Sequence, residues 1–159
     1  IKYFPLELGK KFKNLDTLVI NNSSMLEINA SDLQQFSASF KSFNIQNCDI
    51  EVLETGLFNT MHNLKELSFA FNRIKHVSDG VLTNLKNLTS LWFAGNYCYS
   101  GWSISGSADE VLNMSFDIEG NCKDLSIVNR DDLRDIRLKT YLMMEEVNER
   151  LFKLENEPK

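Results

Sequence analysis

A hydrophobic pattern that recurs about every 24 residues constrains this chain of 159 residues more than any other feature. Four copies keep the spacing L-x-x-L-x-L-x-x-N/C-x-L with apolar residues in the leucine places. They are Leu15, Leu18, Ile20, Ser23, Met25; Phe40, Phe43, Ile45, Cys48, Ile50; Leu64, Leu67, Phe69, Asn72, Ile74; and Leu88, Leu91, Phe93, Asn96, Cys98. A fifth, degraded copy is expected at Asn113, Phe116, Ile118 and Asn121. Such a period predicts stacked units that bury their apolar faces against one another.

Each copy predicts a short strand with one face inward. Leu67 and Phe69 alternate with Ser68 and Ala70, which is the two-residue period of a strand. Because one unit cannot bury its own apolar face, strands from successive units are expected to stack in parallel.

The ninth place of the pattern carries a polar residue that we expect inside the protein. An asparagine there can hydrogen-bond the exposed backbone of adjacent turns. We therefore interpret Asn72, Asn96 and Cys48 as structural residues rather than catalytic or ligand-binding ones.

These copies resemble the leucine-rich repeat family, in the 24-residue form common in animal extracellular proteins, over roughly residues 1–122. The resemblance implies an α/β solenoid with short parallel strands on a concave face, and ligands usually bind to that face. Ile1 takes the last core place of a repeat, so we expect repeats, a cap or a signal peptide upstream of it.

The three cysteines predict one disulfide. Cys98 takes the eleventh place of its copy and Cys122 the tenth of the next, so their backbones are expected on adjacent turns, within disulfide reach. A clamp there is similar to the cysteine-bearing C-terminal caps of secreted leucine-rich repeat proteins. Cys48 is then a buried free thiol or a link to another chain.

Five N-x-S/T triplets are candidate glycosylation sites. They begin at Asn21, Asn22, Asn29, Asn87 and Asn113. With the predicted disulfide they favour a secreted glycoprotein, and an intracellular leucine-rich repeat adaptor or scaffold is the alternative.

Residues 123–159 form a separate helical tail in this interpretation, beginning near Asn129. Val147, Leu151 and Leu154 recur at three-and-four spacing, which fits a coiled coil with another chain. Alternatively, the broader apolar part over residues 136–144 covers the open end of the solenoid. The architecture resembles secreted immune leucine-rich repeat proteins of mosquitoes and related flies, which pair through such a tail and carry a complement-like partner. That resemblance implies a role in innate immunity and a homodimer or heterodimer.

Composition and motifs argue against other classes. The formal charge of −5 disfavours nucleic acid as a partner, and the densest basic cluster, Lys10, Lys11 and Lys13, is expected to be a solvated turn. No apolar run of about 18 residues could span a membrane. Two histidines and no C-x-x-C, G-x-G-x-x-G or H-E-x-x-H motif give no basis for a metal, cofactor or catalytic site.

The repeat frame also predicts which side chains face the ligand side of the strands. Its outward places gather Phe71, Trp92 and Tyr97 on neighbouring turns, with Arg73 beside them. Exposed aromatics and arginine are usual anchors of protein interfaces, so these four residues are the candidate protein-binding site. The alternative is that the tail or the 99–108 loop packs over them. Glycans on Asn21 or Asn22 would block the opposite end of the same face.

Overall fold

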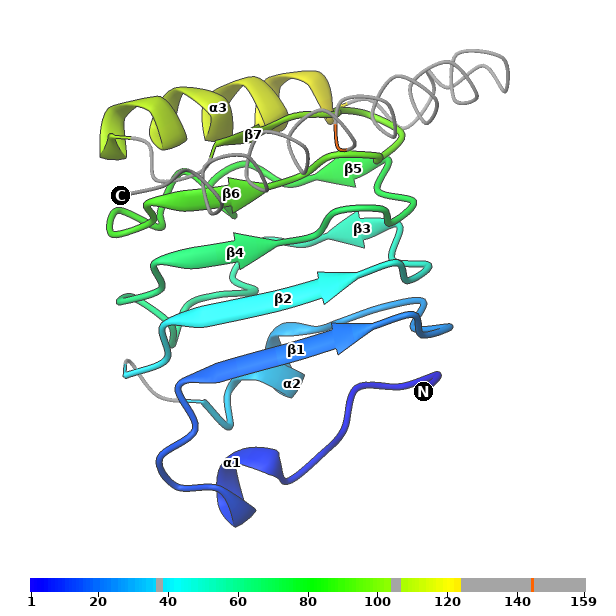
Figure 1. Ribbon diagram of the computed structural model, residues 1–159, viewed down its shortest axis with the longest axis vertical. Helices are drawn as coiled ribbons and strands as arrows, with labels where there is room; N and C mark the ends of the chain where they lie inside the picture. Colours follow the sequence, from blue (N-terminus) through cyan, green and yellow to red (C-terminus); the bar gives the residue numbers. More distant parts are fainter. Residues whose placement is uncertain (37–38, 104–106, 124–143, 145–159) are drawn as a thin grey trace, which may run out of the picture.

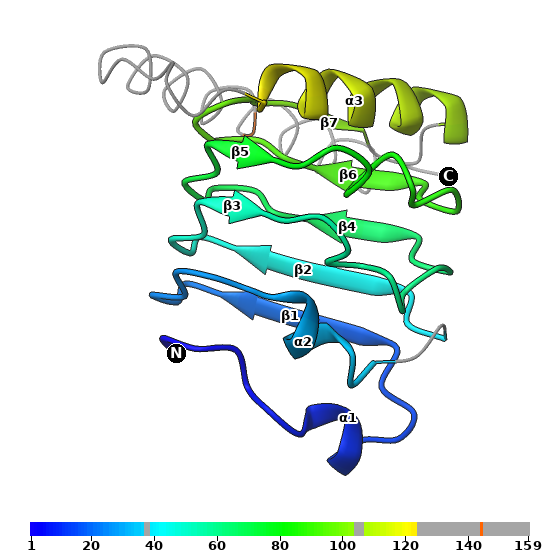
Figure 2. The same cartoon turned by 180° about the vertical axis from the view of Figure 1, so that it is seen from behind.

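The computed structural model shows an α/β solenoid in which parallel strands stack along the long axis (Figure 1). It describes residues 1–36, 39–103, 107–123 and 144. The helices are α1 (Leu8–Lys11), α2 (Ala30–Leu33) and α3 (Ala108–Asn121). The strands are β1 (Thr17–Asn21), β2 (Ser42–Gln46), β3 (Val52–Leu53), β4 (Glu66–Ser68), β5 (His76–Val77), β6 (Ser90–Trp92) and β7 (Trp102–Ser103). The main sheet has the order β1-β2-β4-β6-β7, and β3 pairs with β5 on the opposite side (Figure 2).

Strand pairing follows the repeat frame. Phe43 of β2 lies opposite Leu18 of β1 and Leu67 of β4, and Leu67 lies opposite Leu91 of β6. All three pairings are parallel, as the sequence predicts. Residues at equivalent places of successive units therefore form columns across the sheet.

The core is rich in phenylalanine toward the N-terminal end of the solenoid. Adjacent rings lie 4.7 to 6.3 Å apart between centroids, in stacked, tilted and edge-on pairs that favour close aromatic packing. The rings belong to Phe4, Phe36, Phe40, Phe43, Phe58 and Phe69. Phe4 thereby ties the first residues of the chain to the first units.

The buried asparagines form a ladder between units, which confirms their predicted structural role. Asn72 Nδ2 donates to the carbonyl oxygens of Ile45 at 2.8 Å and Phe69 at 3.0 Å. Asn96 repeats this arrangement one unit later, donating to Phe69 at 2.8 Å and Phe93 at 3.0 Å. Each Oδ1 accepts a backbone N–H, so backbone groups that leave the strand ladder are satisfied without water.

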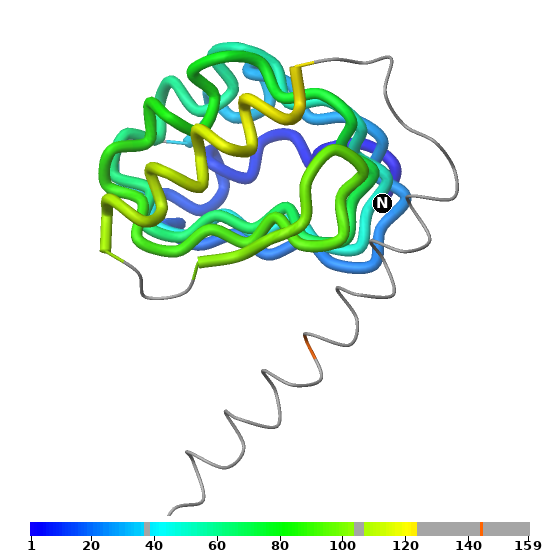
Figure 3. Tube along the Cα trace, turned by 90° about the horizontal axis from the view of Figure 1, so that it is seen from above, coloured from blue at the N-terminus to red at the C-terminus, as the bar shows by residue number. Residues whose placement is uncertain are grey.

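The prediction of a fifth repeat is wrong, because residues 108–121 form helix α3 rather than a strand. Ser107 caps the helix by accepting from the Glu110 N–H, and two acidic residues in the first turn suit its dipole. The apolar residues recur at helical spacing: Val111, Met114 and Ile118 are buried, whereas Phe116 is exposed. α3 lies across the end of the solenoid (Figure 3).

A disulfide joins Cys98 to Cys122, with 5.1 Å between the Cα atoms. Cys122 is the C-cap of α3 and not a strand residue, so the bond ties the helix to the last unit. Cys48 is a buried free thiol. The tail expected from Asn129, including Val147, Leu151 and Leu154, lies outside the described residues, apart from Met144.

Candidate functional site

Two tryptophans form the centre of the candidate site, at the C-terminal end of the main sheet. β7 runs antiparallel to β6 and places Trp102 directly opposite Trp92. The two rings stack with centroids 6.5 Å apart and planes 22° from parallel, and both side chains are partly exposed. The 99–108 loop therefore contributes an aromatic neighbour to Trp92. Sequence reasoning missed Trp102, because that residue lies outside the repeat frame.

Phe71 lies one unit back, in a strained backbone conformation. Its φ is +56°, in the left-handed region that bulky residues avoid. The residues at the equivalent place of the other units, Asn22, Asn47 and Gly95, also have positive φ. A Cβ on Gly95 would lie 2.6 Å from Phe71 Cδ1, so the ring lies against the bare backbone of the next unit. The glycine thus makes room for the aromatic ring.

Charged residues follow at the edge where the strands end. Arg73 Nε lies 2.9 Å from Asp49 Oδ1, the equivalent residue one unit back. Lys75 Nζ lies 3.0 Å from Glu51 Oε2 and 5.8 Å from the centre of the Tyr97 ring. Arg73 and Tyr97 are thus held by intramolecular partners on neighbouring units. Exposed pairs of this kind contribute little stability, but they orient the side chains.

Polar side chains occupy the middle of the same sheet face. Ser42 Oγ donates to Glu66 Oε2 at 3.0 Å, and Gln46 Nε2 donates to Ser68 Oγ at 2.7 Å. Ser68, which was expected to face outward, is only 1% exposed. Ser42 and Ser68 are buried, so these hydrogen bonds link neighbouring strands beneath the surface that the aromatic side chains share.

A buried carboxylate supports the C-terminal end of the solenoid. Glu119 of α3 accepts the backbone N–H groups of Gly80 at 3.0 Å, Leu82 at 2.7 Å and Thr83 at 2.9 Å. The Thr83 hydroxyl donates to it as well, at 3.0 Å. Sequence reasoning missed this residue, because the strand expected at 113–121 gave no reason for a buried acid.

All five candidate glycosylation asparagines are exposed, as an attached glycan requires. Asn21 and Asn22 lie at the end of β1, far along the sheet from Trp92 in β6. Asn87 Nδ2 donates to the His62 carbonyl at 2.9 Å. Glycans on the first two would leave the tryptophan end of the sheet open.

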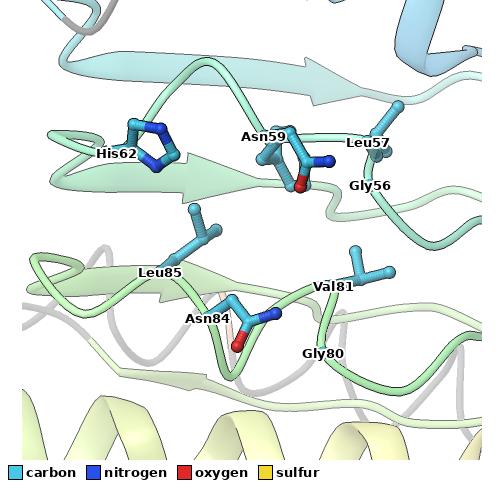
Figure 4. Close-up of a pocket in the computed structure, with 9 residues that line it drawn as sticks. Gly56, Leu57, Asn59, His62, Gly80, Val81, Asn84 and Leu85 are labelled. Atoms are coloured by element: carbon cyan, nitrogen blue, oxygen red, sulfur yellow. The ribbon is translucent and has the colours of Figure 1, made fainter.

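A hollow on the opposite side of the solenoid has no catalytic arrangement of side chains among its lining residues. It has a volume of about 320 Å³ and lies between two successive units, with Asn59 and His62 on one side and Asn84 on the other (Figure 4). His62 is exposed there without a partner acid among the lining residues. The other histidine, His76, is partly buried, with Nε2 3.3 Å from Ser78 Oγ. Nothing in the hollow points to catalysis.

Within the residues that the structure describes, no group of His, Cys, Asp and Glu side chains is arranged to hold a metal ion. No helix in this part of the chain is long and apolar enough to cross a membrane.

Comparison with known proteins agrees with the geometry. Residues 38–97 match the family described as leucine rich repeat, and this span contains β2, β4 and β6. No curated protein matches the chain. The solenoid fold and the match over this part of the chain agree with a leucine-rich repeat architecture, a class that typically serves as a non-enzymatic protein-interaction module.

Proposed function

We propose that this chain is a secreted recognition module that binds a protein ligand on the C-terminal end of its main sheet. The observation that carries the proposal is the stacked, partly exposed pair of Trp92 and Trp102 with Phe71 one unit away. Aromatic side chains at the centre of an interface contribute most of its binding energy. Arg73 and Tyr97 extend this surface toward the edge where the strands end.

Several side chains of this surface are held by contacts within the chain. Phe93 and Ala94, which follow Trp92, are completely buried, and the glycine at position 95 accommodates the Phe71 ring. The Asp49 carboxylate holds the Arg73 guanidinium. Such preorganisation lowers the entropy lost on binding, because few side chains must be ordered anew.

Replacing Trp92 tests the proposal. Immobilised full-length chain is used to capture a ligand from extracellular fluid, and the purified ligand is then titrated against Trp92→Ala and Phe116→Ala. Phe116 is the matched control, since it is an exposed aromatic on α3. We expect Trp92→Ala to weaken binding about 30-fold, as for an interface anchor, and Phe116→Ala to leave it unchanged. A ligand that binds both variants as tightly as the unchanged chain would refute this site.

The proposal of secretion is supported by five exposed N-x-S/T asparagines and by the pairing of Cys98 with Cys122. Disulfides persist in oxidising compartments and are rare in the cytosol. Counting thiols in denatured, unreduced protein isolated from its natural source separates this from the intracellular adaptor. One reactive thiol, from Cys48, supports secretion, and three support the adaptor.

A role in innate immunity and pairing through the C-terminal tail belong to the same proposal. Both are supported by the order of the parts, repeats followed by a segment with a three-and-four apolar seam at Val147, Leu151 and Leu154.

A further inference from the structure

A second groove lies at the edge of the solenoid where the strands begin. Its volume is about 480 Å³, and its lining comes from four successive units. Three lysines, Lys13, Lys41 and Lys65, and three asparagines, Asn14, Asn63 and Asn87, supply most of that lining. The groove does not include the aromatic and charged residues of the proposed protein-binding site.

Stacking of the units brings these lysines together from distant parts of the sequence. The backbone N–H of Lys65 donates to the carbonyl of Lys41 at 2.8 Å, and that of Lys41 donates to the carbonyl of Asp16 at 2.7 Å. Equivalent residues on adjacent strands are about 4.8 Å apart, so the like charges of Lys41 and Lys65 disfavour each other. A bound anion would relieve that repulsion.

One carboxylate, that of Asp16, lines the groove beside the three ammonium groups. Asp16 Oδ2 lies 3.4 Å from Lys41 Nζ. Among the described residues no ion pair involves Lys13 or Lys65. The groove is therefore locally positive in a chain with a formal charge of −5.

Neutral hydrogen-bonding groups alternate with these charges. Asn87 Nδ2 donates to the His62 carbonyl at 2.9 Å and lies 3.4 Å from Asn63 Oδ1, so the two amides are held in place. Amides offer both donors and acceptors, which suits hydroxyl groups. No aromatic side chain lines the groove, so it offers no platform on which nucleic-acid bases could stack.

We propose that this groove binds a linear acidic oligosaccharide. Its sulfate or carboxylate groups pair with Lys13, Lys41 and Lys65, and its hydroxyl groups hydrogen-bond to the asparagine amides. Lys41 and Lys65 take the same place in successive units, and the lining continues over four units, so the groove runs across the strands and suits an extended chain. An N-linked glycan on Asn87 would occupy the same groove, so glycosylation there and binding exclude each other.

A heparin hexasaccharide is the probe, titrated against full-length protein made in a host without N-glycosylation. The groove variant carries Lys13→Gln, Lys41→Gln and Lys65→Gln. The control carries Lys2→Gln, Lys10→Gln and Lys123→Gln, three exposed lysines outside the groove. Relative to the control, the groove variant should bind about tenfold more weakly, the loss expected for three exposed ion pairs. Its affinity should also depend less steeply on salt.

Two further measurements distinguish a saccharide site from a simple anion stripe. Asn63→Ala should weaken heparin binding without changing the binding of inorganic polyphosphate, because only the sugar has hydroxyl groups for the amide. Thermal unfolding of all variants confirms that they are folded. Equal heparin affinity for the groove and control variants overturns the proposal. So does tighter binding of single-stranded DNA of equal charge, or an Asn63→Ala variant that binds heparin normally.

Discussion

At the scale of single residues, the buried asparagines show how much one polar side chain can be predicted. The ninth place of the frame indicates an amide inside the protein, and Asn72 and Asn96 are there with each hydrogen-bonding group paired. Phe71 shows the limit. The sequence indicates its left-handed backbone only indirectly, because the equivalent residues, Asn22, Asn47 and Gly95, are of types that tolerate positive φ. Which ring would then lie against Gly95 depends on packing between units, which the sequence does not state.

Replacing Asn72 by alanine should destabilise the protein by about 2–4 kcal/mol, because buried backbone groups of two units lose their partners. The free energy of unfolding is measured in urea, with Asn84→Ala as the control. Asn84 is exposed, so its loss should change stability by less than about 0.5 kcal/mol. Equal effects of the two substitutions would contradict the structural role of the ladder.

The buried thiol of Cys48 gives a prediction for alkaline pH. Burial raises the pKa of this thiol above its ordinary value of 9.0, and the Asp49 carboxylate acts in the same direction, whereas hydrogen bonds with Ser23 oppose it. The unfolded chain therefore loses the thiol proton first. The free energy of unfolding should be fully retained below the ordinary pKa and should fall as pH rises through the raised one.

Cys48→Ala removes this contribution, so its urea midpoint should fall less between about pH 8 and 10 than that of the unchanged protein. Part of the alkaline loss should persist, because burial also raises the pKa of Tyr99, with the Asp117 carboxylate adding to the effect. If the variant and the unchanged protein show the same pH dependence, Cys48 is not the group responsible.

At the scale of elements, the strands were predictable and the C-terminal helix was not. Four copies of one pattern fix the strands and their register, since every inward residue has an equivalent 24 or 25 positions away. The apolar residues of 108–121 fit both the repeat frame and the spacing of a helix. Ile118 fits the repeat frame and also lies four residues after Met114 on the buried face of α3. Val111, Met114 and Ile118 are buried together on one face of α3, and this helical spacing prevails over the repeat frame.

Glu119 provides the test of how α3 is attached. Glu119→Gln leaves a buried amide N–H facing backbone N–H donors of residues 80–83, so we expect a loss of about 2–3 kcal/mol. Asp117→Asn is the matched control, because it removes the same charge from the exposed side of α3 and should be nearly neutral. Hydrogen exchange should show faster exchange of the Leu82 and Thr83 amides in Glu119→Gln alone. Unchanged exchange of these two amides would show that the Glu119 carboxylate does not hold residues 80–83.

At the scale of the whole molecule, stacking of the units forms charged and apolar surfaces that the overall composition does not indicate. A formal charge of −5 and scattered lysines argue against any anionic partner, yet stacking of the units aligns Lys41 with Lys65 at one edge. The same stacking brings Phe71 beside Gly95 at the C-terminal end of the opposite edge. Positions 24 residues apart become neighbours, so local charge and local apolarity follow the repeat frame rather than the chain average.

The last prediction concerns assembly through the apolar seam of the tail. A chain ending at Asn129 should sediment as a monomer under non-reducing conditions, whereas the full chain should form a concentration-dependent dimer, because Val147, Leu151 and Leu154 need a partner surface. Leu151→Asp in the full chain should abolish the dimer without changing thermal unfolding, since it adds a charge to the seam and leaves the solenoid intact. If instead all three proteins are monomers and the shortened one unfolds at lower temperature, the tail covers the end of the solenoid, and recognition rests on a single copy of the sheet.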